Sequence, residues 1–518
     1  MEYTEKDATT VYETELYRDA LTAECTVEYT LPDYLPELRR ILRVDARPIP
    51  ADRYLDGTHA EFSGLVAFCV VYADGEGRLA ALTQNGDYTL KAECAVPARI
   101  ALADIECDTP VCRLSGPRRL TLRTTVRARP HLLGELTLPA YPTEGLEVLP
   151  YTASVRQSCV SETQEVSLSE SIAVPGVQPD ELRLLACDGG ILFDEARPGE
   201  GSVRLRGTAF IRVLAIREDG TPHAFHSEIP FERELTCDGA APKDACIPTG
   251  CITVLNARPS GDGEGGTRIE LDGVAECAVR LYRNHPITVN RAVYSPDFRT
   301  EVTLANATAE RLLGAMAGSY TVSGSCPVPA GETRAAVILD AVAIPTVRRV
   351  CAEEGRTVIS GDVRVRLLLA GAPEGEDGKI ACSSIEFTHP FRLEPPLSVA
   401  RDAEPRYDVR IEAPRVRARI EDGGYAADTE LALSATAFVE EGFTYVSGVT
   451  RHEDEGYAPR TDCMTVVYPD GGDTLWAIAE RYHTTPARLA AANRIPLAEP
   501  ADAGVIGTLD DVGYLIVE

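Results

Sequence analysis

The chain lacks long apolar runs. No window of its 518 residues approaches eighteen consecutive apolar side chains, although 44% of the residues are hydrophobic, so a membrane-spanning helix is not expected. The first twenty residues are polar and acidic, without a basic segment followed by an apolar one, and no secretory leader is expected. Basic residues are outnumbered, 51 against 80 acidic ones, which gives a formal charge of −29. This charge repels phosphate groups and argues against binding of nucleic acids or anionic membrane surfaces.

Cysteine is frequent, but its spacing excludes the usual frameworks. None of the fifteen cysteines forms a CxxC motif. The closest spacings, Cys107 to Cys112 and Cys246 to Cys251, have no second pair of cysteines or histidines to complete a tetrahedral metal site. Without a leader we expect a reducing compartment, in which the thiols pack as small apolar side chains. No metal site is expected.

Signatures of catalysis are also missing. There is no GxSxG, Walker, HExxH or Rossmann fingerprint in a suitable context. His223 and His226 stand three apart, and residues with that spacing on a strand face opposite sides. The glycine-rich runs from Gly261 and Pro373 are acidic and typical of hairpin turns. We expect no enzymatic activity and no cofactor, with an unrecognised hydrolase as the least favoured alternative.

Three segments of the sequence share one strand pattern. They are SGLVAFCVVYADGEG from Ser63, RGTAFIRVLAIREDG from Arg206 and SGDVRVRLLLAGAPEGEDG from Ser360. When the segments are aligned on their glycines, one face of each strand is entirely apolar and the other is mixed, which predicts strands packed chiefly on one side. A second strand with an aromatic residue follows each, at Tyr88, Phe231 and Phe391.

A second set of anchors repeats with the same period. Pro32, Pro175 and Pro329 are spaced 143 and 154 residues apart, as are Gly64, Gly207 and Gly361. Each proline precedes a short apolar run and an aspartate, which is Asp45, Asp188 or Asp340. With their glycine and proline punctuation and many short strands, these segments predict a mainly β protein of three tandem β-sandwich-like repeats. We place the repeats at 1–148, 149–297 and 298–455, followed by a linker at 456–463.

Residues 464–518 change to a helical period. Asp473 is a suitable helix N-cap, and Thr485 is a second one with Pro486 at the first helical position. The first helix is expected to carry an apolar stripe that consists of Leu475, Ile478, Ala479 and Tyr482. In the second helix, Leu489 and Ala492 are expected to face inward. Asn493 is placed to adopt a left-handed conformation at the helix end. Strands at Thr465–Tyr468 and Tyr514–Val517 complete a β-α-α-β order.

The runs GDTLWAIAERY and LAAANRI in this segment resemble a LysM module. The resemblance implies binding of polymers that contain N-acetylglucosamine, such as peptidoglycan or chitin. It also implies a shallow groove between two loops, in which backbone groups pair with acetamido groups without needing charge. The implied groove residues are Gly472, Asp473, Thr474, Asn493, Arg494, Ile495 and Pro496.

The module departs from the LysM pattern in the first loop. Pro469 replaces the usual apolar residue at the end of the first strand, and Gly471 is extra. A loop altered in this way is compatible with a protein ligand instead of a sugar. Two alternatives stay open: Asp473 and Asn493 are structural caps or ligand contacts, and Trp476 is a packing residue or a sugar platform.

The three repeats are similar to the SPOCS domains of endospore-forming bacteria, most clearly in Ile41-Leu42-Arg43-Val44-Asp45-Ala46. Tandem SPOCS domains followed by one LysM module are typical of spore-coat morphogenesis proteins. The resemblance implies a non-catalytic scaffold in the mother-cell cytoplasm at the forespore surface, recruited by its LysM module to a SpoIVA-like coat-basement protein. The alternative is a protein that binds peptidoglycan or another N-acetylglucosamine polymer of the cortex or cell wall. Self-association is left open.

Overall fold

A computed structural model describes residues 10–517 except 262–265, 331–333, 374–379, 401–403, 459–463, 497–508, 510 and 511. The two glycine-rich runs expected to form hairpin turns fall largely outside the described residues, as do residues 459–463 of the predicted linker. The protein is mainly β, with two short helices near the C-terminus, as predicted.

Each of three units contains a three-stranded antiparallel sheet built around the repeat glycine strand. The sheet orders are β3-β4-β5, β11-β12-β13 and β17-β18-β19. The strands are β3 (Arg40–Asp56), β4 (His59–Ala73), β5 (Leu79–Glu93), β11 (Leu182–Pro198), β12 (Ser202–Arg217), β13 (Pro222–Thr236), β17 (Val337–Glu353), β18 (Arg356–Ala370) and β19 (Cys382–Leu393).

A second sheet faces the first in each unit. These sheets pair β1, β2, β6 and β7 with β8, then β9, β10 and β14 with β15, then β16 and β20 with β21. The strands are β1 (Thr10–Tyr17), β2 (Leu21–Thr30), β6 (Ile100–Cys107), β7 (Val111–Gly116), β8 (Arg119–Leu138), β9 (Glu147–Val160), β10 (Gln164–Val174), β14 (Ala245–Gly261), β15 (Thr267–Tyr294), β16 (Phe298–Pro327), β20 (Arg406–Glu421) and β21 (Gly424–Gly456). A single 3-10 turn, η1 (Pro179–Glu181), precedes β11.

The predicted apolar face of each glycine strand is buried between the two sheets of its unit. In β4 this face consists of Val66, Phe68, Val70 and Tyr72, all with no exposed surface. The corresponding faces of β12 and β18 lie in separate cores of the second and third units. The prediction of β-sandwich-like repeats is therefore confirmed.

The repeat glycine and the following aromatic residue are cross-strand partners. Gly64 lies opposite Tyr88, Gly207 opposite Phe231 and Gly361 opposite Phe391. A Cβ atom added at these glycines would come within 2.6, 2.7 and 2.8 Å of the aromatic side chains. Each ring thus lies over a glycine that has no side chain to displace it, which explains why the two residue types recur together.

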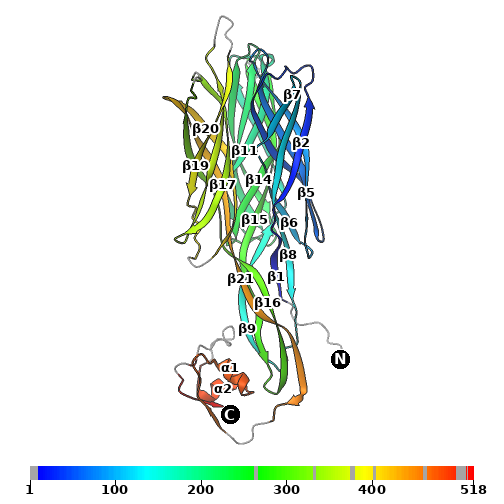
Figure 1. The fold of residues 1–518 in the computed structure, drawn as a ribbon, viewed down its shortest axis with the longest axis vertical. Helices are drawn as coiled ribbons and strands as arrows, with labels where there is room; N and C mark the ends of the chain where they lie inside the picture. Colours follow the sequence, from blue (N-terminus) through cyan, green and yellow to red (C-terminus); the bar gives the residue numbers. More distant parts are fainter. Residues whose placement is uncertain are drawn as a thin grey trace.

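The three units lie side by side and form the main body, and the ends of several long strands extend beyond it toward the C-terminal module (Figure 1). We call this extension the stalk; it comprises the ends of β1, β8, β9, β15, β16 and β21. Its apolar core combines Tyr12 and Leu138 of the first unit with Val155 and Ile287 of the second and Phe443 of the third. The stalk is therefore a joint product of all three repeats.

The units also share an apolar cluster at the centre of the main body. It contains Leu42 and Val71 of the first unit, Leu214 of the second, and Leu339 and Leu368 of the third. Val71 and Leu368 lie on the strand face that the sequence predicted to be less buried, yet neither is exposed to solvent. The predicted alternation therefore holds along most of β4 and β18, and both faces are buried only toward the strand ends, where the mixed faces of the three repeats pack against one another.

An ion-pair network next to this cluster brings the three repeat aspartates together. Arg43 lies 2.7 Å from Asp45 of its own unit and 2.7 Å from Asp340 of the third unit. Arg212 lies 2.9 Å from Asp188 of its own unit and 3.5 Å from Asp340. Burial disfavours the charged form of Asp340, but Arg212 and Arg43 outweigh it and lower the pKa of this carboxyl group.

We expect Asp340→Asn to lower the free energy of unfolding by about 2–4 kcal/mol, because it leaves two buried arginines without their shared counter-charge. Urea unfolding followed by circular dichroism measures the loss. Asp19→Asn, which alters an exposed aspartate, is the matched control. Equal effects of the two substitutions would show that the network does not stabilise the assembly.

Candidate functional site

The C-terminal module has the predicted β-α-α-β order. Its strands β22 (Thr465–Val467) and β23 (Leu515–Val517) pair antiparallel. The helices α1 (Leu475–Arg481) and α2 (Pro486–Asn493) pack on one face of this ribbon. Leu475, Ile478 and Ala479 of the predicted stripe are fully buried, and Tyr482 packs at the edge of the same core.

The N-cap of α1 is Thr474 and not Asp473. The Thr474 hydroxyl accepts a hydrogen bond from the backbone N–H of Ala477 at 3.2 Å. The Asp473 carboxylate instead accepts the N–H of Asp470 at 3.1 Å and pairs with Arg481 at 3.2 Å. The helix starts one residue later than predicted because Asp473 closes the preceding turn. At α2, the Thr485 hydroxyl accepts from the N–H of Arg488, as predicted for an N-cap.

Asn493 connects the second helix to the last strand. Its amide donates to the carbonyls of Leu489 and Ile516 and accepts from the N–H of Ile516 at 2.6 Å. The left-handed residue at the helix end is Arg494, with φ of 56°, so the prediction for Asn493 was wrong. Of the two residues predicted to face inward in α2, Leu489 is buried, whereas Ala492 is only half-buried.

The seven implied groove residues lie before α1 and at the end of α2, and they divide into two groups. The side chains of Asp473, Thr474 and Asn493 are engaged in the internal hydrogen bonds above, and Ile495 packs against the module core. Gly472, Arg494 and Pro496 are exposed. Of the seven residues, Gly472, Arg494 and Pro496 are therefore the ones open to a ligand, whereas the Asp473 and Asn493 side chains stabilise the domain.

Two exposed tyrosines adjoin the strand pair of the module and are further candidates for ligand contact, which the sequence analysis missed. Tyr468 follows β22 with 74% of its surface exposed, and Tyr514 precedes β23 with 57% exposed. The register of the strand pair continues to place them opposite each other, on the face away from the helices. The available signal was the strand alternation, in which Val467 and Leu515 point into the core and their neighbours point outward.

The module docks on the end of the stalk through its other side. Trp476 packs edge-to-face on Tyr294 of β15, with ring centroids 4.9 Å apart. The Tyr294 hydroxyl donates to the Thr484 carbonyl at 2.7 Å, and His483 stacks on Tyr457. Trp476 is only 8% exposed, so its packing role is the one that the structure favours. The exposed groove residues Gly472, Arg494 and Pro496 are not among the residues that make this contact.

Residues 472–498 match the LysM domain family. The C-terminal module is therefore a LysM domain. No curated protein and no solved structure matches the chain significantly. Neither of the two helices in the described part of the chain is long and apolar enough to cross a membrane.

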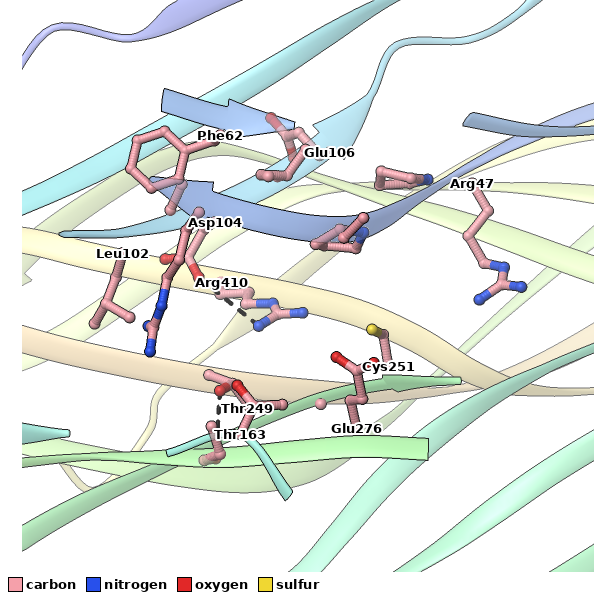
Figure 2. A pocket seen from close by; sticks show the side chains of 18 of the residues that line it. Arg47, Phe62, Leu102, Asp104, Glu106, Thr163, Thr249, Cys251, Glu276 and Arg410 are labelled. Atoms are coloured by element: carbon pink, nitrogen blue, oxygen red, sulfur yellow. Dashed lines mark hydrogen bonds and ion pairs between the residues drawn. The ribbon is translucent and has the colours of Figure 1, made fainter. Parts of the chain in front are cut away.

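A cavity of about 480 Å³ lies between the units in the main body (Figure 2). Its wall combines Arg47 and Asp104 of the first unit, Glu276 of the second and Arg410 of the third with apolar side chains such as Phe62. The charged groups largely neutralise one another, since Asp104 pairs with Arg280 at 2.7 Å and Arg410 pairs with Glu412 at 2.5 Å. The sequence did not predict this cavity, because the units that enclose it are far apart along the chain.

Next to the cavity, three possible metal ligands converge. Side-chain atoms of Asp104, His131 and Asp408 lie within 4.8 Å of one another. However, both oxygens of Asp104 accept hydrogen bonds from Arg280, and Asp408 pairs with Arg129 at 2.7 Å. A cation would have to compete with two arginines, so the chemistry of these groups is that of an ion-pair network.

His131 is the titratable centre of this network. Burial opposes protonation of the ring, but hydrogen bonds to Asp104 and Glu15 and the charge of Asp408 outweigh it and raise the pKa to about 9. The imidazolium thus links the first unit to the third at neutral pH. A histidine with a raised pKa contributes stability that is fully present below the unfolded value of about 6.5 and is lost as the pH rises through the folded value.

We expect the wild-type free energy of unfolding to fall by on the order of 3 kcal/mol between pH 6.5 and 9, and this fall to be much smaller in His131→Gln. Urea unfolding at several pH values measures the difference. The control is His59→Gln, which removes an exposed histidine. A slope that persists unchanged in His131→Gln would assign the pH dependence to other groups.

We expect Tyr294→Ala to weaken docking of the LysM domain on the stalk by about 1–3 kcal/mol, because both the ring contact and a hydrogen bond are lost. Trp476 is the only tryptophan, so its emission reports the change directly. A red shift and stronger quenching by acrylamide are expected.

The control for docking is Tyr54→Ala, which removes an exposed tyrosine of β3. Emission of Tyr294→Ala identical to that of the wild type and of Tyr54→Ala would mean that the Tyr294 contact does not hold the domain.

Proposed function

We propose that this chain is a non-catalytic scaffold that binds N-acetylglucosamine-containing glycan, such as peptidoglycan, through its LysM domain. The match of residues 472–498 to the LysM family carries the proposal. The exposure of Gly472, Arg494 and Pro496, on loops other than those that contact the stalk, supports it further. No part of the proposal requires a metal ion or a cofactor.

The chemistry of the loops suits a neutral sugar. A glycan adds no charge, so the net charge of −29 on the protein does not oppose its approach. In this proposal the exposed residues Gly472, Arg494 and Pro496 contact the acetamido groups, while Tyr468 and Tyr514 offer ring faces for the apolar side of a pyranose. Both kinds of contact are individually weak and depend little on salt.

The second candidate is an adaptor of spore-coat assembly, similar to SipL. Its LysM domain would bind a SpoIVA-like coat-basement protein at the forespore surface, in the mother-cell cytoplasm. The three repeats with aligned proline, aspartate and glycine favour this reading, because they carry the resemblance to SPOCS domains. Pro469 and Gly471 support it too, since they alter the loop that forms one side of the groove. In this reading the units present partner surfaces and the LysM domain determines location.

Sedimentation of the full chain with purified peptidoglycan tests the first proposal. We expect retention that resists salt and is competed by chitin oligomers. Tyr468→Ala should weaken binding by about 1 kcal/mol, roughly fivefold, through loss of the ring contact. Tyr54→Ala, on the main body, should bind like the wild type.

The same preparation, incubated with an immobilised coat-basement protein, separates the two candidates. Glycan binding that chitin oligomers do not compete, or no glycan binding at all, would contradict the first proposal. Capture by the coat-basement protein under those conditions would favour the adaptor.

A further inference from the structure

Two cysteine thiols of the second unit face each other. The Sγ atoms of Cys159 and Cys237 are 3.3 Å apart, and the Cys159 thiol also donates to the carbonyl of Asp238 at 2.8 Å. Cys159 lies in β9, opposite Leu281 of β15. Cys237 directly follows β13 and is fixed in a turn, in which its N–H donates to the Gly201 carbonyl and its own carbonyl accepts from Ala240. The pair therefore connects the two facing sheets of the unit.

Only one member of the pair is open to solvent. Cys237 is 1% exposed and belongs to the apolar core of the unit. Cys159 is half-buried and lines an open cleft of about 570 Å³ between the first and second units. An accessible thiol in front of a buried one is the arrangement in which the first thiol meets an external oxidant and the second completes the reaction.

The cleft next to Cys159 is lined by charges of both signs, which are the arginines Arg53, Arg99 and Arg283 and the acidic residues Glu162 and Asp238. Arg283 pairs with Asp244 and Arg99 with Glu135. Arg53 is exposed at the cleft wall. With two acidic residues in its wall and two of its arginines paired with carboxylates, the cleft has no excess of positive charge, so it does not select an oxidant by charge.

We propose that Cys159 and Cys237 form a thiol–disulfide exchange site that takes a low-molecular-weight disulfide from the cleft and becomes an intramolecular disulfide. The Cys159 thiolate attacks one sulfur of the oxidant RSSR, which forms a mixed disulfide and releases RS⁻. Cys237, after losing its proton to water, attacks Cys159 Sγ and releases the second RS⁻. The two thiols are oxidised, RSSR is reduced to two RSH, and the two protons end on those products.

Burial, followed by the neighbouring Cys159, raises the pKa of Cys237 to about 12. The second step should therefore be the slower one at neutral pH and should accelerate as the pH rises. In a reducing compartment both thiols stay reduced, consistent with the expectation from the sequence. Under oxidising conditions the new bond would close a loop of 78 residues and join the two sheets covalently.

The test treats the reduced full chain with oxidised glutathione and maps the products by mass spectrometry after alkylation. We expect a peptide pair linked through Cys159 and Cys237, the loss of two free thiols, and a higher thermal midpoint that dithiothreitol reverses. Cys237→Ser should instead retain one glutathione on Cys159, because the attacking thiol is gone. Cys159→Ser should form neither the link nor the adduct at this position.

Cys94→Ser is the matched control, since it removes a half-buried cysteine of the first unit and should leave the reaction unchanged. Circular dichroism of each variant verifies folding. A stable glutathione adduct on wild-type Cys159, or a disulfide between other cysteines with this pair still reduced, would overturn the proposal.

Discussion

The ion pairs between Asp45, Asp188, Asp340 and their arginines link the three units at the centre of the main body. Each aspartate comes from a different repeat, and Arg43 and Arg212 each pair with their own unit and with Asp340. Removing one partner of a buried ion pair lowers the free energy of unfolding, because the other charge stays buried without its partner. Each unit is therefore stabilised by contact with its neighbours. The adjacent apolar cluster adds hydrophobic burial to the same contact between the units.

Repeat alignment explains the fold of one unit but not the contacts between units. The apolar face, the glycine and the aromatic residue recur in every repeat, because each unit packs an aromatic side chain over the glycine of the neighbouring strand. The charge network is different in each repeat. The position five residues after the aligned glycine is Cys69 in the first unit, Arg212 in the second and Arg366 in the third. Because the first unit has no arginine at this position, Arg43 of the neighbouring strand makes the ion pair with Asp340. A pattern that changes between repeats could not be read as one conserved contact.

In the LysM domain, too, the local structure could be predicted from the sequence, whereas the contacts between distant residues could not. Strand order, helix positions and the buried stripe follow from local periodicity, which the sequence displays directly. The roles of Asp473 and Asn493 depend on partners further along the chain, Arg481 and Ile516, and on which of two adjacent residues caps the helix. Docking on Tyr294 depends on a residue 182 positions before Trp476, and no local pattern indicates such a contact.

The docked position of the LysM domain affects how binding would work. A module on a free linker searches a large volume and loses orientational entropy when it binds. Here Trp476, His483 and Thr484 contact the stalk, whose core is shared by all three units, so part of that entropy is already lost before the ligand arrives. Several chains attached to one polymer would therefore present their main bodies at a defined distance and orientation from it. A rigid spacer of this kind favours ordered assembly on a surface more than capture of a mobile ligand.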